Sequence, residues 1–307
     1  MANITAGMVK DLRDRTGAGM MDCKSALNET GGDMEAAIDW LRKKGVMKAA
    51  KKAGRAAAEG LVGVATGNGS GALIEVNAET DFVARNEEFK SFVKSAAAIA
   101  LKEEGKLDKV LAASHASSTV QQTLTELVAK IGENMSVRRA IALAVNPGVV
   151  AAYVHNAASP ELGKIGVLVA LKSTAPEDKL MGLAKQIAMH VAAASPLALT
   201  EAEMPKEVVD REYAVQKDLA LQSGKPEAVV EKMMAGRMRK YFEDTVLMYQ
   251  TFVIDGETQI AKVIEKASKD FGAPVEIAGF VRFQVGEGIE KVEADFADEV
   301  AQMAGTR

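Results

Sequence analysis

The stretch EVNAETDFVARNEEF, from Glu75 to Phe89, joins an apolar strand to an amphipathic helix and so indicates a fold of mixed strands and helices. The strand spans residues 72–77 and the helix residues 87–101. Between them, Asp81 and Phe82 place an acid beside a large aromatic at the mouth of a loop. Two interpretations are open. Either Phe82 packs in the core near a helix that Asp81 or the preceding threonine caps, or it is exposed for contact with a partner.

The pattern of this stretch occurs twice in the middle of the chain. Residues 71–101 and residues 163–196 share the order glycine, apolar strand, loop, amphipathic helix. A hairpin of strands about the turn GNGSG opens the first copy, and SVRRAIALAV is typical of a further strand. We therefore predict an α+β core of two related halves, residues 55–145 and residues 146–285.

Helical units are predicted on both sides of this core and within its second half. Residues 1–54 form a module of three short helices that ends in a basic connector, KKGVMKAAKKAGR. Residues 196–242 contain two long helices about Gly224-Lys225-Pro226, which predicts an inserted antiparallel helical hairpin. Residues 286–307 predict a final amphipathic helix, from Ile289 to Met303.

The composition is that of an ordinary globular protein with more than one domain: 307 residues, 48% hydrophobic, 26% charged, net charge −4. No run approaches the roughly 18 apolar residues of a membrane helix, so no membrane is expected. The start MANITAGMVKDL lacks the apolar core of a secretory signal, and Cys23 is the only cysteine. These features predict a cytoplasmic location, and the mild acidity argues against nucleic acid as the main partner.

Signals of catalytic or metal chemistry are sparse. Cys23 and the three histidines, His115, His155 and His190, show no metal-ligand spacing, so no metal site is expected. VGEGIEK lacks the third glycine of a dinucleotide-binding turn, and no cofactor is predicted. A dispersed hydrolase or transferase site stays open as one alternative. The basic run 43–55 leaves a nucleic-acid or ribosome-binding module as another, although a solvated connector is favoured because no aromatics interleave it.

Six motifs stand in order along the chain: TGAGMMDCKSAL, EVNAETDFVARNEEF, AKIGENMSVRR, IAMHVAAASP, QSGKPEAVVEKMMAGRM and VRFQVGEGIEKVEADFA. Together they resemble the elongation factor Ts family of bacteria, over essentially the whole chain. The resemblance implies a guanine-nucleotide exchange factor for elongation factor Tu. Such a protein binds Tu in its GDP-bound and nucleotide-free forms, releases GDP and lets GTP enter. It performs no covalent chemistry, so the resemblance implies no enzyme activity.

The resemblance also implies which residues carry this activity. The N-terminal module is similar to ubiquitin-associated domains and docks on the GTPase domain of Tu, which the C-terminal helix also reaches. The loop after the first repeated strand inserts into that domain and displaces magnesium; its residues here are Thr80, Asp81, Phe82 and Val83. Further contacts with Tu match Arg13, Met20, Met21, Lys24, Ile131, Gly132 and His155.

Three of these expectations keep an alternative. Met20 and Met21 can equally pack in the core of their own module. His155 can be an ordinary half-exposed loop histidine. The helical hairpin either packs on its own core or pairs two copies of the chain, which would give a homodimer or a two-to-two complex with Tu.

Overall fold

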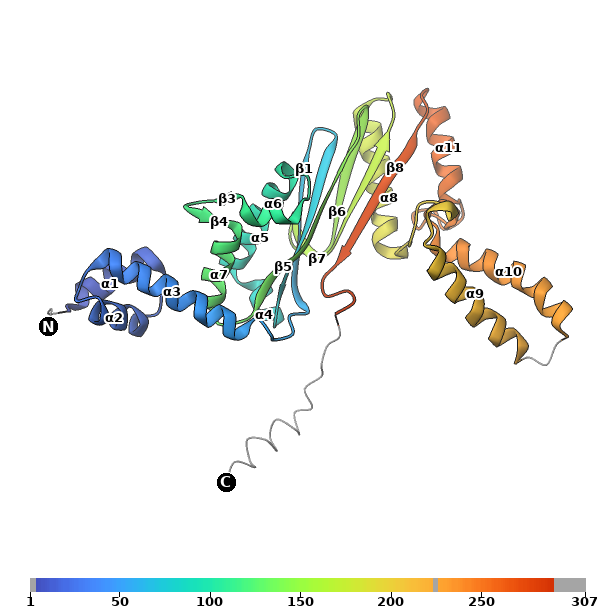
Figure 1. Cartoon of the computed structure of the whole chain (residues 1–307). Helices are drawn as coiled ribbons and strands as arrows, with labels where there is room; N and C mark the ends of the chain where they lie inside the picture. Colours follow the sequence, from blue (N-terminus) through green and yellow to red (C-terminus); the bar gives the residue numbers. More distant parts are fainter. Residues whose placement is uncertain (1–3, 223–225, 290–307) are drawn as a thin grey trace.

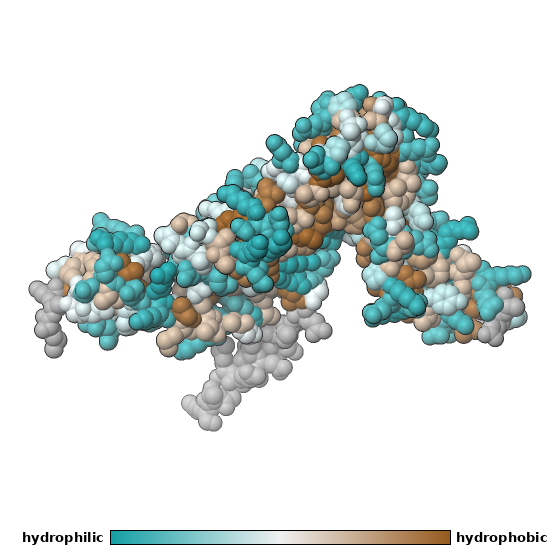
Figure 2. Space-filling view, turned by 45° about the horizontal axis from the view of Figure 1, so that its top comes forward, coloured by the Kyte–Doolittle hydropathy of each residue, from teal (hydrophilic) through white to brown (hydrophobic). Residues whose placement is uncertain are grey.

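The computed structural model describes residues 4–222 and 226–289 (Figure 1). The molecule is elongated, with a small helical module at the N-terminal end, a layered body in the middle and two long helices at the other end. Apolar residues gather along the body in the space-filling view (Figure 2). No helix in the described part of the chain is both long and apolar enough to cross a membrane. The helix predicted for residues 289–303 lies, after its first residue, outside the described residues.

The N-terminal module contains the helices α1 (Ala6–Thr16), α2 (Met20–Glu29) and α3 (Met34–Lys52). Thr5 and Asp33 cap α1 and α3, because their side chains accept backbone N–H groups of the first turn. The helices close on a small apolar core formed by Val9, Leu12, Cys23, Ala26, Leu27 and Ala37.

Helix α3 extends further than the sequence analysis predicted. It continues through most of the basic segment to Lys52, so the module and its connector share one helix. Alanine and lysine, which dominate this segment, favour helix over a separate linker. A Cβ at Gly45 would lie 3.3 Å from the Ala129 Cβ on α7 (Val120–Ile131), so the glycine lets α3 approach the body closely.

The body contains one six-stranded antiparallel sheet made of two three-stranded parts. In the first part the strand order is β5-β2-β1, and in the second part β7 lies between β6 and β8. The parts are joined where Val62 and Gly63 of β1 pair with Gly163 and Leu162 of β7. The strands are β1 (Glu59–Gly67), β2 (Ser70–Ala78), β5 (Met135–Ala144), β6 (Gly148–Ser159), β7 (Leu162–Lys172) and β8 (Glu276–Gln284).

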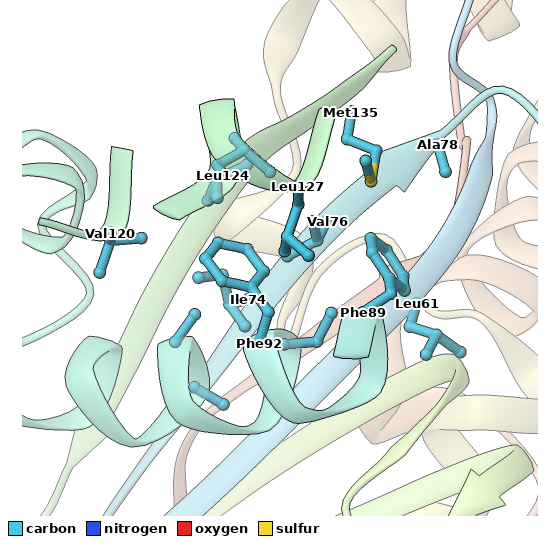
Figure 3. Packing of buried hydrophobic residues seen from close by; sticks show 14 of the residues in the cluster. Leu61, Ile74, Val76, Ala78, Phe89, Phe92, Val120, Leu124, Leu127 and Met135 are labelled. Carbon is cyan, nitrogen blue, oxygen red and sulfur yellow. The ribbon is translucent and has the colours of Figure 1, made fainter. Parts of the chain in front are cut away.

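Helices cover the outer face of each part of the sheet. Helices α5 (Glu87–Lys102) and α7 pack on the first part, and α8 (Glu177–Ala194) and α11 (Ile260–Phe271) pack on the second. Figure 3 shows Phe89 and Phe92 of α5 among apolar side chains of β2 and α7. The inner faces of the two parts pack on each other through Val62, Val64, Leu73, Val150, Leu168, Ala170 and Phe283.

The two parts repeat the same topology, in agreement with the repeat seen in the sequence. In each, a hairpin is followed by helices and by a third strand that pairs with the second strand of the hairpin. The pairing with the third strand is interrupted by an irregularity in both parts. It lies between Glu75 and Val76 in β2 and between Ala170 and Leu171 in β7.

Two glycines allow the inner faces to approach each other. A Cβ at Gly71 would lie 2.9 Å from Cδ2 of Leu168, and a Cβ at Gly166 would lie 3.1 Å from Cδ2 of Leu73. Counted from the two irregularities, Gly71 corresponds to Gly166 and Leu73 to Leu168. The contact is therefore reciprocal, as expected for two halves related by an approximate two-fold axis.

Two long helices, α9 (Lys206–Leu221) and α10 (Glu227–Thr245), lie between α8 and α11 in the chain. They run side by side in opposite directions (Figure 1), and the Arg237 guanidinium donates a 2.9 Å hydrogen bond to Oε1 of Gln216. Their seam contains Ala220, Val230, Met234 and Met238. The remaining elements are α4 (Asp81–Arg85), α6 (Leu107–Ala112), β3 (Ser114–His115), β4 (Ser118–Thr119), η1 (Glu201–Glu203) and η2 (Leu247–Tyr249).

Candidate partner-binding site

The loop after β2 folds into the single-turn helix α4 before α5 begins. Thr80 occupies the N-cap position of α4, but its side chain caps no backbone N–H there. Asn86 separates the two helices, because its Oδ1 accepts the backbone N–H groups of Glu88 and Phe89 at 2.9 and 3.1 Å. The loop therefore contains a separate short helix, α4, between β2 and α5.

Helix α4 has one exposed and one buried side. The side chain of Phe82 is 74% exposed, whereas Val83 is 3% exposed and packs in the core beneath α5. The Arg85 guanidinium lies 5.9 Å from the centre of the Phe82 ring and binds Asp81 at 2.8 Å. The interpretation of Phe82 as a core residue is therefore wrong. Asp81 and Phe82 face outward, while Val83 anchors the turn.

The segment after α7 holds the base of this loop. The carboxylate of Glu133 accepts a hydrogen bond from the backbone N–H of Thr80 at 3.0 Å and another from its hydroxyl at 2.8 Å. Gly132 ends α7 in the left-handed conformation, with φ of 90°, and Ile131 packs at the edge of the same core. The structure therefore brings Ile131 and Gly132 next to the Thr80–Val83 loop, although Ile131 lies 48 positions after Val83 in the sequence.

The predicted contacts on the N-terminal module lie on its surface. Met20 and Met21 begin α2 with exposed fractions of 51% and 73%, so their packing in the module's own core is wrong. Arg13 and Lys24 are exposed as well. Cys23, the next residue but one, fills the core in place of the methionines.

The basic run is tied to the protein rather than freely solvated. Lys44 and Lys48 bind the two carboxylate oxygens of Asp22 at 3.1 and 2.8 Å, and Lys52 donates to the backbone carbonyl of Gly132. The hydrogen bond from Lys48 holds the pKa of Asp22 below its ordinary value. These three lysines of the predicted connector are therefore half-exposed and already paired, which leaves less basic charge for a nucleic acid.

His155 lies on strand β6, in the second half, rather than in a loop. Its side chain is exposed, and its Nδ1 is 3.2 Å from the hydroxyl of Tyr153. The following residue, Asn156, adopts a positive φ of 50°, just before the pairing of β6 with β7 shifts register. The structure therefore presents His155 at the surface of β6, in the other half of the body from the loop at Phe82.

The described ranges contain no candidate metal cluster. No group of three or more His, Cys, Asp or Glu residues is placed to hold a metal ion. His115 contacts the Thr123 hydroxyl, and His190 is fully buried with Gln250, so both are structural histidines.

Comparison with known proteins identifies the family. A family model described as Elongation factor TS matches residues 79–287. The elongation factor Ts of Rhodospirillum rubrum is 60% identical over 304 residues, 98% of each chain. That of Paramagnetospirillum magneticum is 59% identical over 100% of this chain and 99% of the relative. The chain belongs to the elongation factor Ts family. It is a translation elongation factor that exchanges nucleotide on elongation factor Tu.

Two carboxylates at the base of the loop and a third in β2 are not among the residues that the sequence predicts for this elongation factor Ts chain. Glu79 and Glu133 bind the segments that meet at the base of the loop, and Glu75 is fully buried in β2. An acid inside the apolar run ALIEV is the signal that marks Glu75. Glu133 is one of two polar residues that follow the glycine of AKIGEN, which is the signal for it, but no pattern in the sequence predicts that it binds Thr80.

Glu75 joins the first half to the end of the second. Its carboxylate accepts hydrogen bonds from the backbone N–H of Gly286 at 2.8 Å, from Arg138 at 3.1 Å and from Arg139. Burial opposes ionisation, but the Gly286 N–H and the neighbouring side chains outweigh it and hold the pKa of Glu75 below its ordinary value. The turn after β8 is thereby fixed against β2 and β5.

Proposed function

We propose that this chain accelerates GDP release from Tu by inserting the Thr80–Val83 loop into the GTPase domain and displacing the nucleotide-bound magnesium. The observation that supports this proposal best is the exposure of Phe82, 74%, on a turn whose neighbour Val83 is buried. A large aromatic held outward on an anchored turn is suited to wedge between elements of a partner.

The physical basis of displacement is the strict geometry of magnesium. Mg²⁺ requires a near-ideal octahedral shell, so a small shift of its ligands is costly. Burying Phe82 against Tu releases roughly 1.5 to 3 kcal/mol, and this stabilisation exists only in the wedged state. By linkage, the loss of GDP affinity on Tu equals the loss of this chain's affinity when nucleotide rebinds. No covalent step is needed, so the chain has no catalytic chemistry of its own.

The other units supply further contacts in this proposal. Residues 1–54, a module like ubiquitin-associated domains, dock on the GTPase domain, and residues 286–307 reach the same domain. Residues 55–145 and 146–285 form the core, with the helical hairpin of residues 196–242 inserted in the second half. The contact residues are Arg13, Met20, Met21, Lys24, Ile131, Gly132 and His155. Because the proposed partner Tu acts in translation, the complex is proposed to form in the cytoplasm.

Release of a fluorescent GDP analogue from Tu tests the proposal. The chain is expected to raise the release rate in proportion to its concentration until Tu is saturated. EDTA, which removes magnesium, is the matched reference: Tu stripped of magnesium releases GDP faster, and the chain should then add less. An unchanged release rate at saturating chain, or an undiminished acceleration in EDTA, contradicts magnesium displacement.

The stoichiometry of the complex is a separate measurement. We propose a contact between copies through the helical hairpin as the route to a two-to-two complex. Light scattering of the chain mixed with Tu distinguishes this assembly from a one-to-one complex by mass. A one-to-one mass at all concentrations would assign the hairpin to packing on its own core.

A further inference from the structure

We infer that Glu133 is a positioning residue that sets the orientation of Phe82, an assignment that rests on the proposed function. One carboxylate oxygen accepts the backbone N–H of Thr80 at 3.0 Å, and the other accepts its hydroxyl at 2.8 Å. Thr80 directly precedes α4, so two hydrogen bonds to one rigid carboxylate fix both the backbone and the side chain where the turn begins. Phe82, two residues later, takes its direction from that point.

A second carboxylate holds the same junction from the opposite side. Glu79 accepts the backbone N–H of Asn134 and lies 3.4 Å from the Arg55 guanidinium, while the Asn134 amide donates to the Arg55 carbonyl at 2.7 Å. Each strand end therefore offers a carboxylate to the backbone of the other. Such a reciprocal pair restricts rotation about the junction more than either bond alone.

We call the hydrogen bonds of Glu133 with Thr80 and of Glu79 with Asn134 the clamp. The clamp also connects the loop to the N-terminal module. Lys52, the last residue of α3, donates to the carbonyl of Gly132, the residue before Glu133. Helix α3 carries Lys44 and Lys48, which bind Asp22 on α2, close to the exposed Met21. The two surfaces proposed to contact Tu thus share one support, and Glu133 is the link between that support and the loop.

The test compares Glu133→Ala with Glu133→Gln in the GDP-release assay at saturating and limiting chain. Alanine removes both acceptors. Glutamine keeps one acceptor, its carbonyl oxygen, for the Thr80 N–H, and its amide donates to the Thr80 hydroxyl oxygen, so both contacts are retained with the second one reversed. Glu133→Ala is expected to lower the maximal release rate about tenfold, with the half-saturating concentration changed less than about twofold. Glu133→Gln should stay within about twofold of the original rate. Glu126→Ala removes an exposed carboxylate of α7, the helix that ends just before Glu133, and is the matched control that should leave the rate unchanged.

The outcomes separate the clamp from other roles. Equal losses for Glu133→Ala and Glu133→Gln would show that the charge matters rather than the hydrogen bonds, and would overturn the inference. A full maximal rate for Glu133→Ala would overturn it as well. Failure of the unmodified chain to accelerate release would instead refute the proposed function and leave this assay silent on Glu133. The next measurement covers that case.

Hydrogen exchange of the Thr80 amide gives a readout that needs no Tu. The amide is expected to be protected in the unmodified chain and in Glu133→Gln, and to lose at least about tenfold protection in Glu133→Ala. Thr80→Val removes the hydroxyl alone, and combining it with Glu133→Ala in a double-mutant cycle tests whether the two side chains act through the same contact. It should slow GDP release in the original background and add nothing in Glu133→Ala. Unchanged protection in Glu133→Ala, or additive losses, would refute the clamp even if the variant is less stable.

Discussion

The loops after β2 and after β7 occupy the same place in two halves of one topology, yet they are built differently. Counted from the irregularities in pairing, Phe82 corresponds to Glu177. After β7 the Ser173 hydroxyl accepts the Ala175 N–H at 3.1 Å, and α8 begins directly at Glu177. After β2 the positions that match the first turns of α8 form the separate short helix α4, on which Phe82 is exposed. The repeated fold is a support, and its loops decide what each half contacts.

The cores of the two halves differ in a related way. At the irregularity, the first half buries the charged Glu75, where the second half has Ala170. Under the helix, the first half buries Phe89, where the second has Ala184. The half that carries the loop is thus held by a large aromatic and a buried ionic network. We expect its stability to depend more on single side chains.

The largest effect is expected at Phe89, which is fully buried. Phe89→Ala leaves a cavity beneath α5 and should lower the free energy of unfolding by about 3 to 5 kcal/mol. Denaturant titration measures the change. Phe92, on the same helix, is the comparison residue with a similar expected loss. A loss of unfolding free energy below about 0.5 kcal/mol would contradict the difference drawn between the two halves, because the first half would then not depend on its aromatic core.

Phe82→Ala should give the opposite combination. The free energy of unfolding should change by no more than about 0.5 kcal/mol, since the side chain is largely exposed. GDP release from Tu should slow by roughly ten- to a hundredfold, the equivalent of 1.5 to 3 kcal/mol of lost burial. Denaturant midpoint and release rate are measured on one sample. A large fall in midpoint, or full exchange activity, would refute the assignment of Phe82 as the wedge.

Gly71→Ala and Gly166→Ala test the approximate symmetry. Their Cβ atoms would lie 2.9 Å and 3.1 Å from the opposing leucines, closer than ordinary van der Waals contact. Each substitution should cost about 1 to 3 kcal/mol through overpacking, with similar values for both. Gly182→Ala, where no atom lies within 4 Å of the added Cβ, is the control and should not destabilise. Strongly unequal costs at Gly71 and Gly166 would show that the halves do not share the interface evenly.

The smallest effect concerns pH and the second half. Burial lowers the pKa of His190, whose Nε2 contacts Oε1 of Gln250 at 2.9 Å and whose Nδ1 accepts the Val253 N–H at 3.3 Å. The unfolded chain therefore takes up a proton first, near the ordinary value of 6.5, and stability is lost as the pH falls below that value. The loss is at most about 1.4 kcal/mol for one pH unit.

Denaturant titrations at pH 7.5 and 5.5 measure this loss. His190→Gln should reduce the difference between the two pH values, even if it lowers stability at both. Glu75 is the comparison group in the first half. Its pKa is held below the ordinary value of 4.5, so its stabilisation is retained above that pH and lost only as the pH falls through more acidic values. An unchanged pH dependence in His190→Gln would contradict the assignment to His190.

The sequence by itself determined the periodic elements and their order. Alternating and helical apolar patterns depend on local geometry, so the hairpin, the helix after it and the internal repeat could be predicted. The continuity of α3 was missed because a run of lysines without an apolar face gives helical propensity and no clear end. The same helical pattern places Phe89 on the apolar face of its helix, where it is buried, but no periodic pattern covers Phe82, so the sequence left its burial open.

Tertiary structure alone decided which side chains form the site. Phe89 is covered because β2 and α7 close over it, whereas Phe82 is exposed because Val83 takes the core position on the same turn. Glu133 reaches Thr80 across 53 residues, and Lys52 reaches Gly132 across 80. Neither contact produces a periodic pattern in the sequence, because a hydrogen bond between segments that are far apart in the sequence depends on how the whole chain packs.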